Sequence, residues 1–174
     1  MSRLTFRSGG IHPPTHKELA PSDSYTVLEM PPLLSIPMAQ HLGAPAKIAV
    51  KKKQELQAGD VVGEPAGFVS TFIHTPVAGT VKPESRVVMG AMQSDVVNVE
   101  PAEGANLWEL DRNPDPLDLD SVDPAELIEK VKAAGIVGMG GATFPTHVKL
   151  SPPKGVEVDV VLINGAECEP YLTA

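Results

Sequence analysis

Short apolar runs alternate with turn-forming residues through a long stretch of the chain. Between residues 38 and 100, valine and isoleucine recur in short runs that are separated by glycine, proline, aspartate and serine. Runs of this kind, bounded by turn formers, are typical of β-strands. The pattern predicts an all-β region, with strands near residues 48–50, 61–62, 72–73, 87–89 and 96–99.

A different period begins at residue 123. Asp123 suits the N-cap of a helix, Pro124 its first position and Glu126 its third. Gly135 suits the left-handed position that follows the last helical turn. Between these signals, apolar residues fall at helical spacing on one face, namely Leu127, Ile128, Val131 and Ala134. We therefore predict a short helix over residues 124–134.

Residues 156–163 begin in apolar–polar alternation and end in four continuous apolar residues, before Asn164 and Gly165. This pattern predicts a strand that is buried on both faces, as in a parallel sheet. It would be the first strand of an α/β domain. Because one strand makes no sheet, we expect this domain to be cut short at Ala174.

Proline and glycine mark the remaining segments. Residues 1–37 are dense in both, which predicts an extended arm with an edge strand at residues 25–28. Residues 101–122 combine acids with X-Pro steps and predict a linker. The expected organisation is an arm at 1–37, a β domain at 38–100, a linker at 101–122 and the incomplete α/β domain at 123–174.

Composition and charge exclude several functions. With 42% hydrophobic residues the chain can form a packed core, and its net charge of −8 argues against nucleic-acid binding. The single cysteine, Cys168, excludes a disulfide framework and an iron–sulfur cluster ligated by this segment alone. Signal-peptide and membrane-span patterns are absent from the sequence, and its histidines are too scattered to predict a metal site. The basic run is either solvated surface or a docking point for a partner; it comprises Lys47, Lys51, Lys52 and Lys53.

The β region resembles the flattened barrel of biotinyl and lipoyl carrier domains. A Gly59–Asp60 turn precedes a strand-like segment at residues 73–81 with a Pro-x-x-Gly step. Carriers present a modifiable lysine between the two halves of the barrel, but no lysine occurs from Gln54 to Val81. Lys53 also stands where carriers usually have a turn glycine. We expect a barrel-sandwich hybrid that serves as a scaffold, within a mixed α+β chain.

Two loops carry the candidate chemistry. Residues 138–149 are rich in glycine and end at Lys149, so N–H groups and an ammonium could approach a phosphate or a planar ring. The loop departs from the Rossmann fingerprint at Thr143 and lacks the Walker order, which leaves a structural turn as an equal alternative. Residues 164–171 follow the predicted strand, where ligands of α/β sheets gather. The alternative there is a polar turn with exposed acids.

Four motifs carry a family resemblance: Gly-Gly-Ile-His-Pro-Pro at 9–14, Gln-His-Leu-Gly-Ala-Pro at 40–45, and the two longer motifs at 134–149 and 164–173. Together they resemble the C subunit of the Rnf electron-transport complex. The last two are also similar to loops of the FMN- and NADH-binding flavoprotein subunit of respiratory complex I. The resemblance implies that FMN is lined by Gly138, Gly140, Gly141 and Lys149. It also implies that Asn164 and Glu167 hold the flavin and that Glu169 faces the nicotinamide nucleotide.

The resemblance implies the N-terminal part of a membrane-associated oxidoreductase subunit. Such a subunit passes electrons between NADH/NAD⁺ and ferredoxin through FMN and 4Fe–4S clusters, coupled to ion transport. The clusters would lie beyond Ala174, and this segment alone would be inactive and bind no cofactor. The implied partners are the other subunits of the complex, NADH/NAD⁺ and, indirectly, ferredoxin. The implied location is the cytoplasmic face of the bacterial cell membrane. Two alternatives stay open: a related flavoprotein, such as a microcompartment cobalamin reductase, and a non-catalytic docking module.

Overall fold

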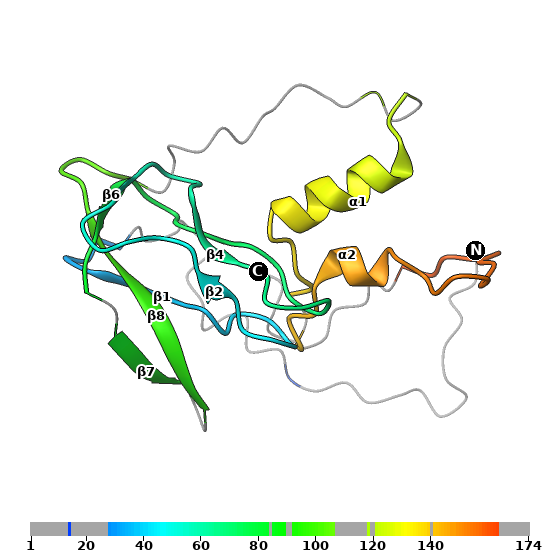
Figure 1. Cartoon of the computed structure of the whole chain (residues 1–174), viewed down its shortest axis with the longest axis horizontal. Helices are drawn as coiled ribbons and strands as arrows, with labels where there is room; N and C mark the ends of the chain where they lie inside the picture. Colours follow the sequence, from blue (N-terminus) through cyan, green and yellow to red (C-terminus); the bar gives the residue numbers. More distant parts are fainter. Residues whose placement is uncertain are drawn as a thin grey trace. The chain divides into compact units, whose positions relative to one another are not determined.

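The computed structural model describes residues 14, 28–83, 85–89, 92–106, 118, 121–139 and 141–163 (Figure 1). The chain divides into two units, Glu29–Val156 and a second unit made of Met1–Leu28 with Glu157–Ala174. The regular elements described all lie in the first unit. They are β1 (Leu34–Pro37), β2 (Lys47–Ile48), β3 (Glu55–Leu56), β4 (Val61–Glu64), β5 (Ile73–His74), β6 (Gly79–Val81), β7 (Ser85–Met89), β8 (Met92–Pro101), α1 (Pro124–Ala133) and α2 (Thr146–Lys149).

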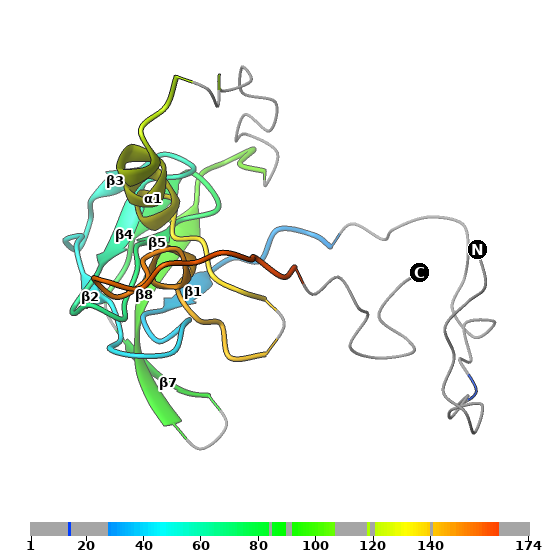
Figure 2. The same ribbon diagram turned by 90° about the vertical axis from the view of Figure 1, so that its right-hand side faces the viewer.

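The strands form a five-stranded sheet and a three-stranded sheet. The larger sheet has the order β1-β8-β6-β3, with β7 also paired to β8, and all its pairs are antiparallel. The long strand β8 organises this sheet because it pairs with three others (Figure 2). The smaller sheet has the order β2-β4-β5, with a bulge between Val61 and Gly63.

Valine dominates the core between the sheets. Val62 of β4 and Val99 of β8 are completely buried, and Leu56 of β3 is 2% exposed. Burying a side chain of this size contributes about 1.5–3 kcal/mol. Gly63 lets the sheets approach closely, because a Cβ there would lie 3.0 Å from the sulfur of Met38 and 3.3 Å from the Cβ of Ile73. The core is therefore apolar, well filled and shared by both sheets.

The predicted β architecture is confirmed, since each predicted strand overlaps an observed one. Lys53 has φ +68°, the left-handed conformation that a turn glycine adopts readily. The expectation that Lys53 stands at a glycine-type turn is therefore confirmed. β1 falls within the stretch assigned to the arm, and β3 has no counterpart among the predicted runs. The edge strand at residues 25–28 lies outside the described residues except for Leu28, which has no regular structure.

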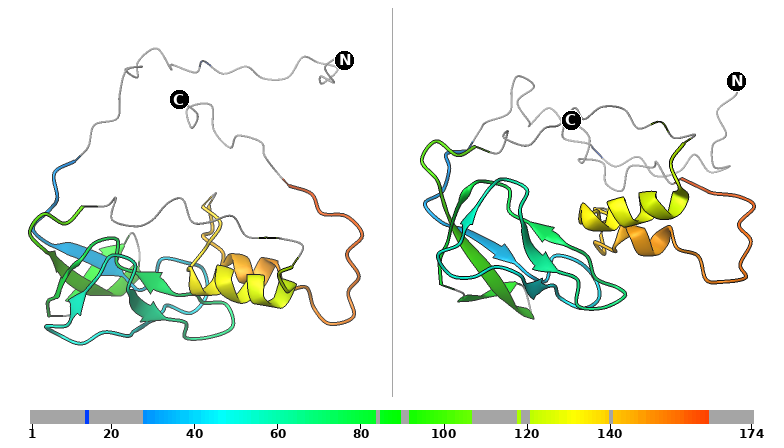
Figure 3. Two further views of the ribbon diagram at one scale, coloured as in Figure 1. Left: turned by 90° about the horizontal axis from the view of Figure 1, so that it is seen from above. Right: turned by 45° about the horizontal axis from the view of Figure 1, so that its top comes forward.

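The predicted helix is confirmed as α1. Asp123 is its N-cap, and the Asp123 side chain accepts a hydrogen bond from the N–H of Ala125 at 3.0 Å. Gly135 follows the helix with φ +69°, as its left-handed role requires. The apolar face is only partly inward, because Leu127, Ile128 and Val131 are half-buried and Ala134 is exposed. The helix packs beside α2 at one end of the β-structure (Figure 3).

The predicted buried strand at residues 156–163 is wrong for the described structure. These residues form no strand, and their apolar side chains are exposed, Leu162 by 90%. A strand is stable only when neighbouring strands satisfy its N–H and C=O groups. No described strand pairs with this segment, so its apolar pattern has nothing to be buried against.

Candidate cofactor-binding loop

The glycine-rich loop is closed at its base by backbone pairing. Val137 and Pro145 form an isolated antiparallel bridge. The N–H of Gly138 donates to the carbonyl of Phe144 at 3.0 Å, and that of Thr146 donates to the carbonyl of Ile136 at 2.9 Å. Directly after the bridge, the chain makes the single helical turn α2, which ends at Lys149. The sequence-predicted loop 138–149 is therefore a closed loop followed by a helical turn.

The turn of α2 brings Lys149 back to the start of the loop. A side chain at Gly138 would collide with the ammonium group of Lys149. Glycine is needed at this position because its missing side chain leaves room for that cation. Gly141 has φ +134° and open space around its Cα, so its backbone is accessible from outside.

The loop also contains strained backbone. Thr143 has φ +48°, which is uncommon for a non-glycine residue and more so for a β-branched one. Its hydroxyl donates to the carbonyl of Ala142 at 2.8 Å. The Rossmann fingerprint has a glycine where this threonine stands. The structure shows that the position is indeed one that glycine would occupy without strain.

The donors that a bound anion would need are present in this loop. Within the described part of the chain, the N–H groups of Met139, Gly141 and Ala142 make no hydrogen bond. Lys149 is exposed and pairs with no described carboxylate. Free N–H groups beside an ammonium form a concave donor set of the kind that binds phosphate. The residues present therefore fit the phosphate end of a flavin mononucleotide.

The described structure brings together three of the predicted site residues, Gly138, Gly141 and Lys149. Four others lie outside the described residues, namely Gly140, Asn164, Glu167 and Glu169. Sequence reasoning gave no role to the barrel segment at residues 40–45, although its motif was part of the family resemblance. In the structure this segment contacts the loop, because the N–H of Leu42 donates to the carbonyl of Thr143 at 3.3 Å.

Two histidines lie where the helical segment meets the barrel. His147 of α2 is buried, and its Nδ1 has no hydrogen-bond partner in the described structure. Burial lowers the pKa of His147 below its ordinary value of 6.5, against the opposing effect of the Phe68 carbonyl. Burial likewise lowers the pKa of His74 on β5, where the carbonyl of Ala133 opposes it. Both imidazoles are therefore held in the neutral form.

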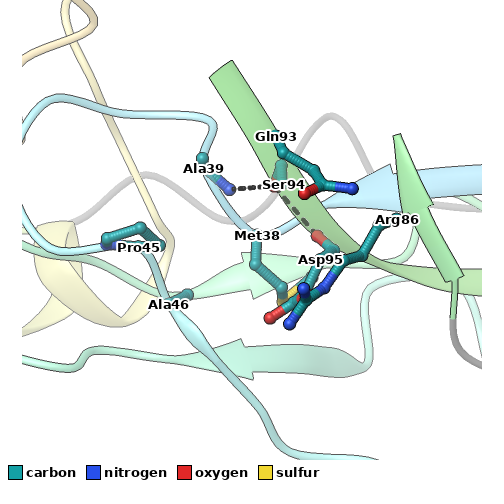
Figure 4. A pocket seen from close by; sticks show the side chains of 8 residues that line it. All are labelled: Met38, Ala39, Pro45, Ala46, Arg86, Gln93, Ser94 and Asp95. Carbon is teal, nitrogen blue, oxygen red and sulfur yellow. Dashed lines mark hydrogen bonds and ion pairs between the residues drawn. The ribbon is translucent and has the colours of Figure 1, made fainter. Parts of the chain in front are cut away.

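A second hollow lies away from the loop, on the larger sheet. It encloses about 270 Å³ and is lined by Met38, Ala39, Pro45, Ala46, Arg86, Gln93, Ser94 and Asp95 (Figure 4). Its one cation is already neutralised, since Arg86 Nε lies 2.7 Å from Asp95 Oδ1. None of the predicted site residues lines it. The described residues contain no group of three or more histidine, cysteine or acidic side chains placed to hold a metal ion.

The fold and the loop define a class of protein: a β scaffold that carries the beginning of a cofactor-binding segment. Comparison with known families agrees. Residues 4–103 match the RnfC barrel sandwich hybrid domain, and residues 131–174 match the Nuo51 FMN-binding domain. The chain belongs to the RnfC family, as its motifs predict. The barrel-sandwich expectation is thereby confirmed.

Curated relatives match almost the whole chain. The C subunit of the Na⁺-translocating ferredoxin:NAD⁺ oxidoreductase complex of Acetobacterium woodii is 42% identical over 98% of the chain and 38% of its own length. Its counterpart in the proton-translocating ferredoxin:NAD⁺ oxidoreductase complex of Clostridium ljungdahlii is 37% identical over 98% of the chain and 37% of its own length. The counterpart in the ion-translocating oxidoreductase complex of Rhodobacter capsulatus is 38% identical over 95% and 32%. The chain therefore spans about a third of the length of these relatives.

Proposed function

We propose that this segment is the N-terminal part of an electron-transfer subunit that works between NADH/NAD⁺ and ferredoxin in an ion-translocating membrane complex. The observation that carries the proposal is the loop of residues 138–149, where free N–H donors lie beside a lysine that pairs with no described carboxylate. The match to an FMN-binding family model covers this loop and continues to residue 174. The names of the relatives support the reaction and the complex.

In this proposal FMN is bound mainly by its phosphate at the loop. The ammonium of Lys149 and the N–H groups around Gly140 and Gly141 would face the phosphate, and Gly138 would leave space for the lysine. Asn164 and Glu167 would hold the polar edge of the flavin, and Glu169 would face the nicotinamide nucleotide. When bound, FMN can accept a hydride from NADH and release its electrons one at a time.

The rest of the proposed machinery lies outside this segment. The 4Fe–4S clusters that receive the electrons would be carried by the remainder of the protein, since this segment has a single cysteine. In the described structure no helix is long and apolar enough to cross a membrane. We propose that the protein lies on the cytoplasmic face of the membrane and is held there by other subunits.

The four-part division into arm, barrel, linker and cofactor-binding segment stays a prediction, with boundaries at residues 37, 100 and 122. The barrel would act as the scaffold on which the cofactor-binding segment is mounted. We expect the 174-residue segment alone to bind FMN poorly. The strand that should support the second loop is unpaired in the described structure, so the flavin would lack one wall of its site.

The test uses the full-length protein, that is, this segment extended to the length of its relatives. Lys149→Gln should weaken FMN binding about tenfold or more, because a hydrogen bond to a charged group contributes roughly 1.5–3 kcal/mol. Flavin fluorescence titration measures the affinity. Lys154→Gln, which removes an exposed lysine outside the loop, is the matched control and should leave the affinity unchanged.

Two further variants probe the parts of the site that the described structure does not include. Gly140→Leu should block the approach of the phosphate, and Glu167→Ala should loosen the flavin ring. Both should lower the flavin content of the purified full-length protein. The proposal would be overturned by a full-length protein that binds no FMN, or by unchanged affinity in the Lys149, Gly140 and Glu167 variants together.

A further inference from the structure

The helical segment rests on two turns of the barrel, residues 40–44 and 68–72. The hydroxyl of Thr71 donates to the carbonyl of Lys132 at 3.0 Å, which holds the end of α1. A side chain at Gly135 would collide with the carbonyl of Phe72, so the backbones touch there. Together with the hydrogen bond from Leu42 to Thr143, these contacts fix both ends of the segment that carries the loop.

The junction is held by polar contacts more than by apolar packing. A cavity of about 120 Å³ lies along it, lined by Gln40, His41, Thr71, Phe72, Ile73, His74, Gly135 and Val137. Interiors that rely on packing leave few voids larger than a water molecule. The position of the loop relative to the barrel therefore depends on individual hydrogen bonds.

His41 lies at the centre of these hydrogen bonds. It is buried, and its Nε2 accepts a hydrogen bond from the N–H of Thr71 at 3.3 Å. The ring proton is then on Nδ1, which lies 3.2 Å from the carbonyl of Leu42 and donates to it. The imidazole thus joins one barrel turn to the other and fixes the peptide of Leu42.

The two barrel turns are also joined beside the ring. The N–H of Ala44 donates to the carbonyl of Val69 at 3.0 Å, and the hydroxyl of Ser70 donates to the carbonyl of Ala44 at 2.9 Å. Gly43, with φ +102°, allows this close approach, because a side chain there would collide with the Val69 carbonyl. These bonds are made by Ala44 and not by Leu42, so the histidine is the contact that sets the direction of the Leu42 peptide.

The strained residue of the loop depends on that peptide. Strained backbone persists only when its surroundings hold it in place. For Thr143 the contact that comes from outside the loop, within the described structure, is the hydrogen bond from the Leu42 N–H. A series of contacts therefore runs from Thr71 through His41 and Leu42 to Thr143, and from there to the N–H groups of the loop.

We propose that His41 is a positioning residue for the cofactor-binding loop: it holds the Leu42 N–H against Thr143 and so keeps the loop in its binding conformation. This inference rests on the proposed FMN function. It gives the barrel a direct role in the site, because one of its buried side chains determines the geometry of a loop that follows it by about a hundred residues in sequence.

The test is a double-mutant cycle in the full-length protein. His41→Leu should weaken FMN binding about tenfold, a coupling in the range found for residues in contact. Thr143→Gly removes the strain at the loop, so the loop no longer needs to be held. In that background His41→Leu should change the affinity by less than about threefold, whereas a general loss of stability would weaken binding equally in both backgrounds.

His74→Leu is the matched control, because His74 lines the same cavity but faces the end of α1 and not the loop. It should leave FMN affinity unchanged. If His41→Leu does not fold, His41→Asn replaces it, since asparagine keeps a polar group but is too short to join both barrel turns. The cycle is then measured with this variant, and the same coupling to Thr143→Gly is expected.

The outcomes separate the inference from the function on which it rests. A wild-type protein that binds no FMN overturns the proposed function, and the positioning role with it. A protein that binds FMN with equal affinity in the wild type and the His41 variant overturns the positioning role alone. Equal weakening of binding in both Thr143 backgrounds also overturns it.

Discussion

The β-structure of residues 34–101 and the helical segment of residues 121–150 differ in where their apolar side chains lie. Val62, Val96, Val97 and Val99 of the β-structure are at most 1% exposed. In the helical segment α1 has no buried residue, and Met139 is 91% exposed. The β-structure therefore has a core of its own, whereas the helical segment is fixed by polar contacts and close glycine fits at the barrel. A loop mounted in this way can be adjusted without repacking a core.

The largest expected effect lies in the β core. Leu56→Ala should lower the free energy of unfolding by about 2–5 kcal/mol, because a buried side chain is lost and a cavity remains. Urea denaturation of the 174-residue chain measures this change. Leu162→Ala, at a residue that is 90% exposed, is the matched control and should change the value by less than about 0.5 kcal/mol. Equal effects at both positions would contradict the contrast between the two regions.

The next largest effect concerns the glycine that touches the barrel. Gly135→Ala should destabilise the chain by more than about 1 kcal/mol, because it combines an unfavourable positive φ with a collision at the Phe72 carbonyl. Gly104→Ala is the control: it also has a positive φ, +77°, but nothing lies within 4 Å of the added Cβ. The difference between the two thermal melts isolates the contact at the junction. A smaller loss at Gly135 than at Gly104 would show that the segment does not rest on Phe72.

The third prediction concerns pH. Because the folded-state pKa of His147 is lowered, the neutral form is favoured on folding. The resulting stability is fully present above the unfolded-state pKa of 6.5 and is lost as the pH falls through it toward the folded-state value. Urea midpoints measured on either side of pH 6.5 should therefore fall toward acid. His147→Gln should reduce this slope and leave the part that arises from His74, whose pKa is lowered too. An unchanged slope would contradict the burial of His147 at the junction.

The smallest expected effect is at the lysine turn. Lys53→Gly should leave stability unchanged or raise it by up to about 1 kcal/mol, because φ +68° suits glycine. Lys52→Gly removes the same charge from the same exposed turn, but that residue has no positive φ, so the added chain entropy should lower stability. Thermal melts of the two variants should thus move in opposite directions. Parallel changes would indicate that charge and not backbone conformation governs this turn.

Several features could be predicted from the sequence because they are local. The Asp123 cap, the Pro124 start and the Gly135 end of α1 act within a few residues of one another. The turn at Lys53 is also local, and so are the short apolar runs that become strands. The glycine loop was identified by its composition, and its closeness to Lys149 follows from a single helical turn.

The sequence by itself determined the local elements, the β class and, through its motifs, the family. Tertiary structure alone decided which strands pair, since β8 joins the distant strand β1 as well as its neighbour β7. It also showed that residues 156–163 remain an exposed apolar segment, because a strand needs neighbours that a local pattern cannot supply. The role of His41 became visible only there. Its hydrogen bonds connect residues 41, 71 and 143, and no local signal in a sequence records which distant backbone groups will meet.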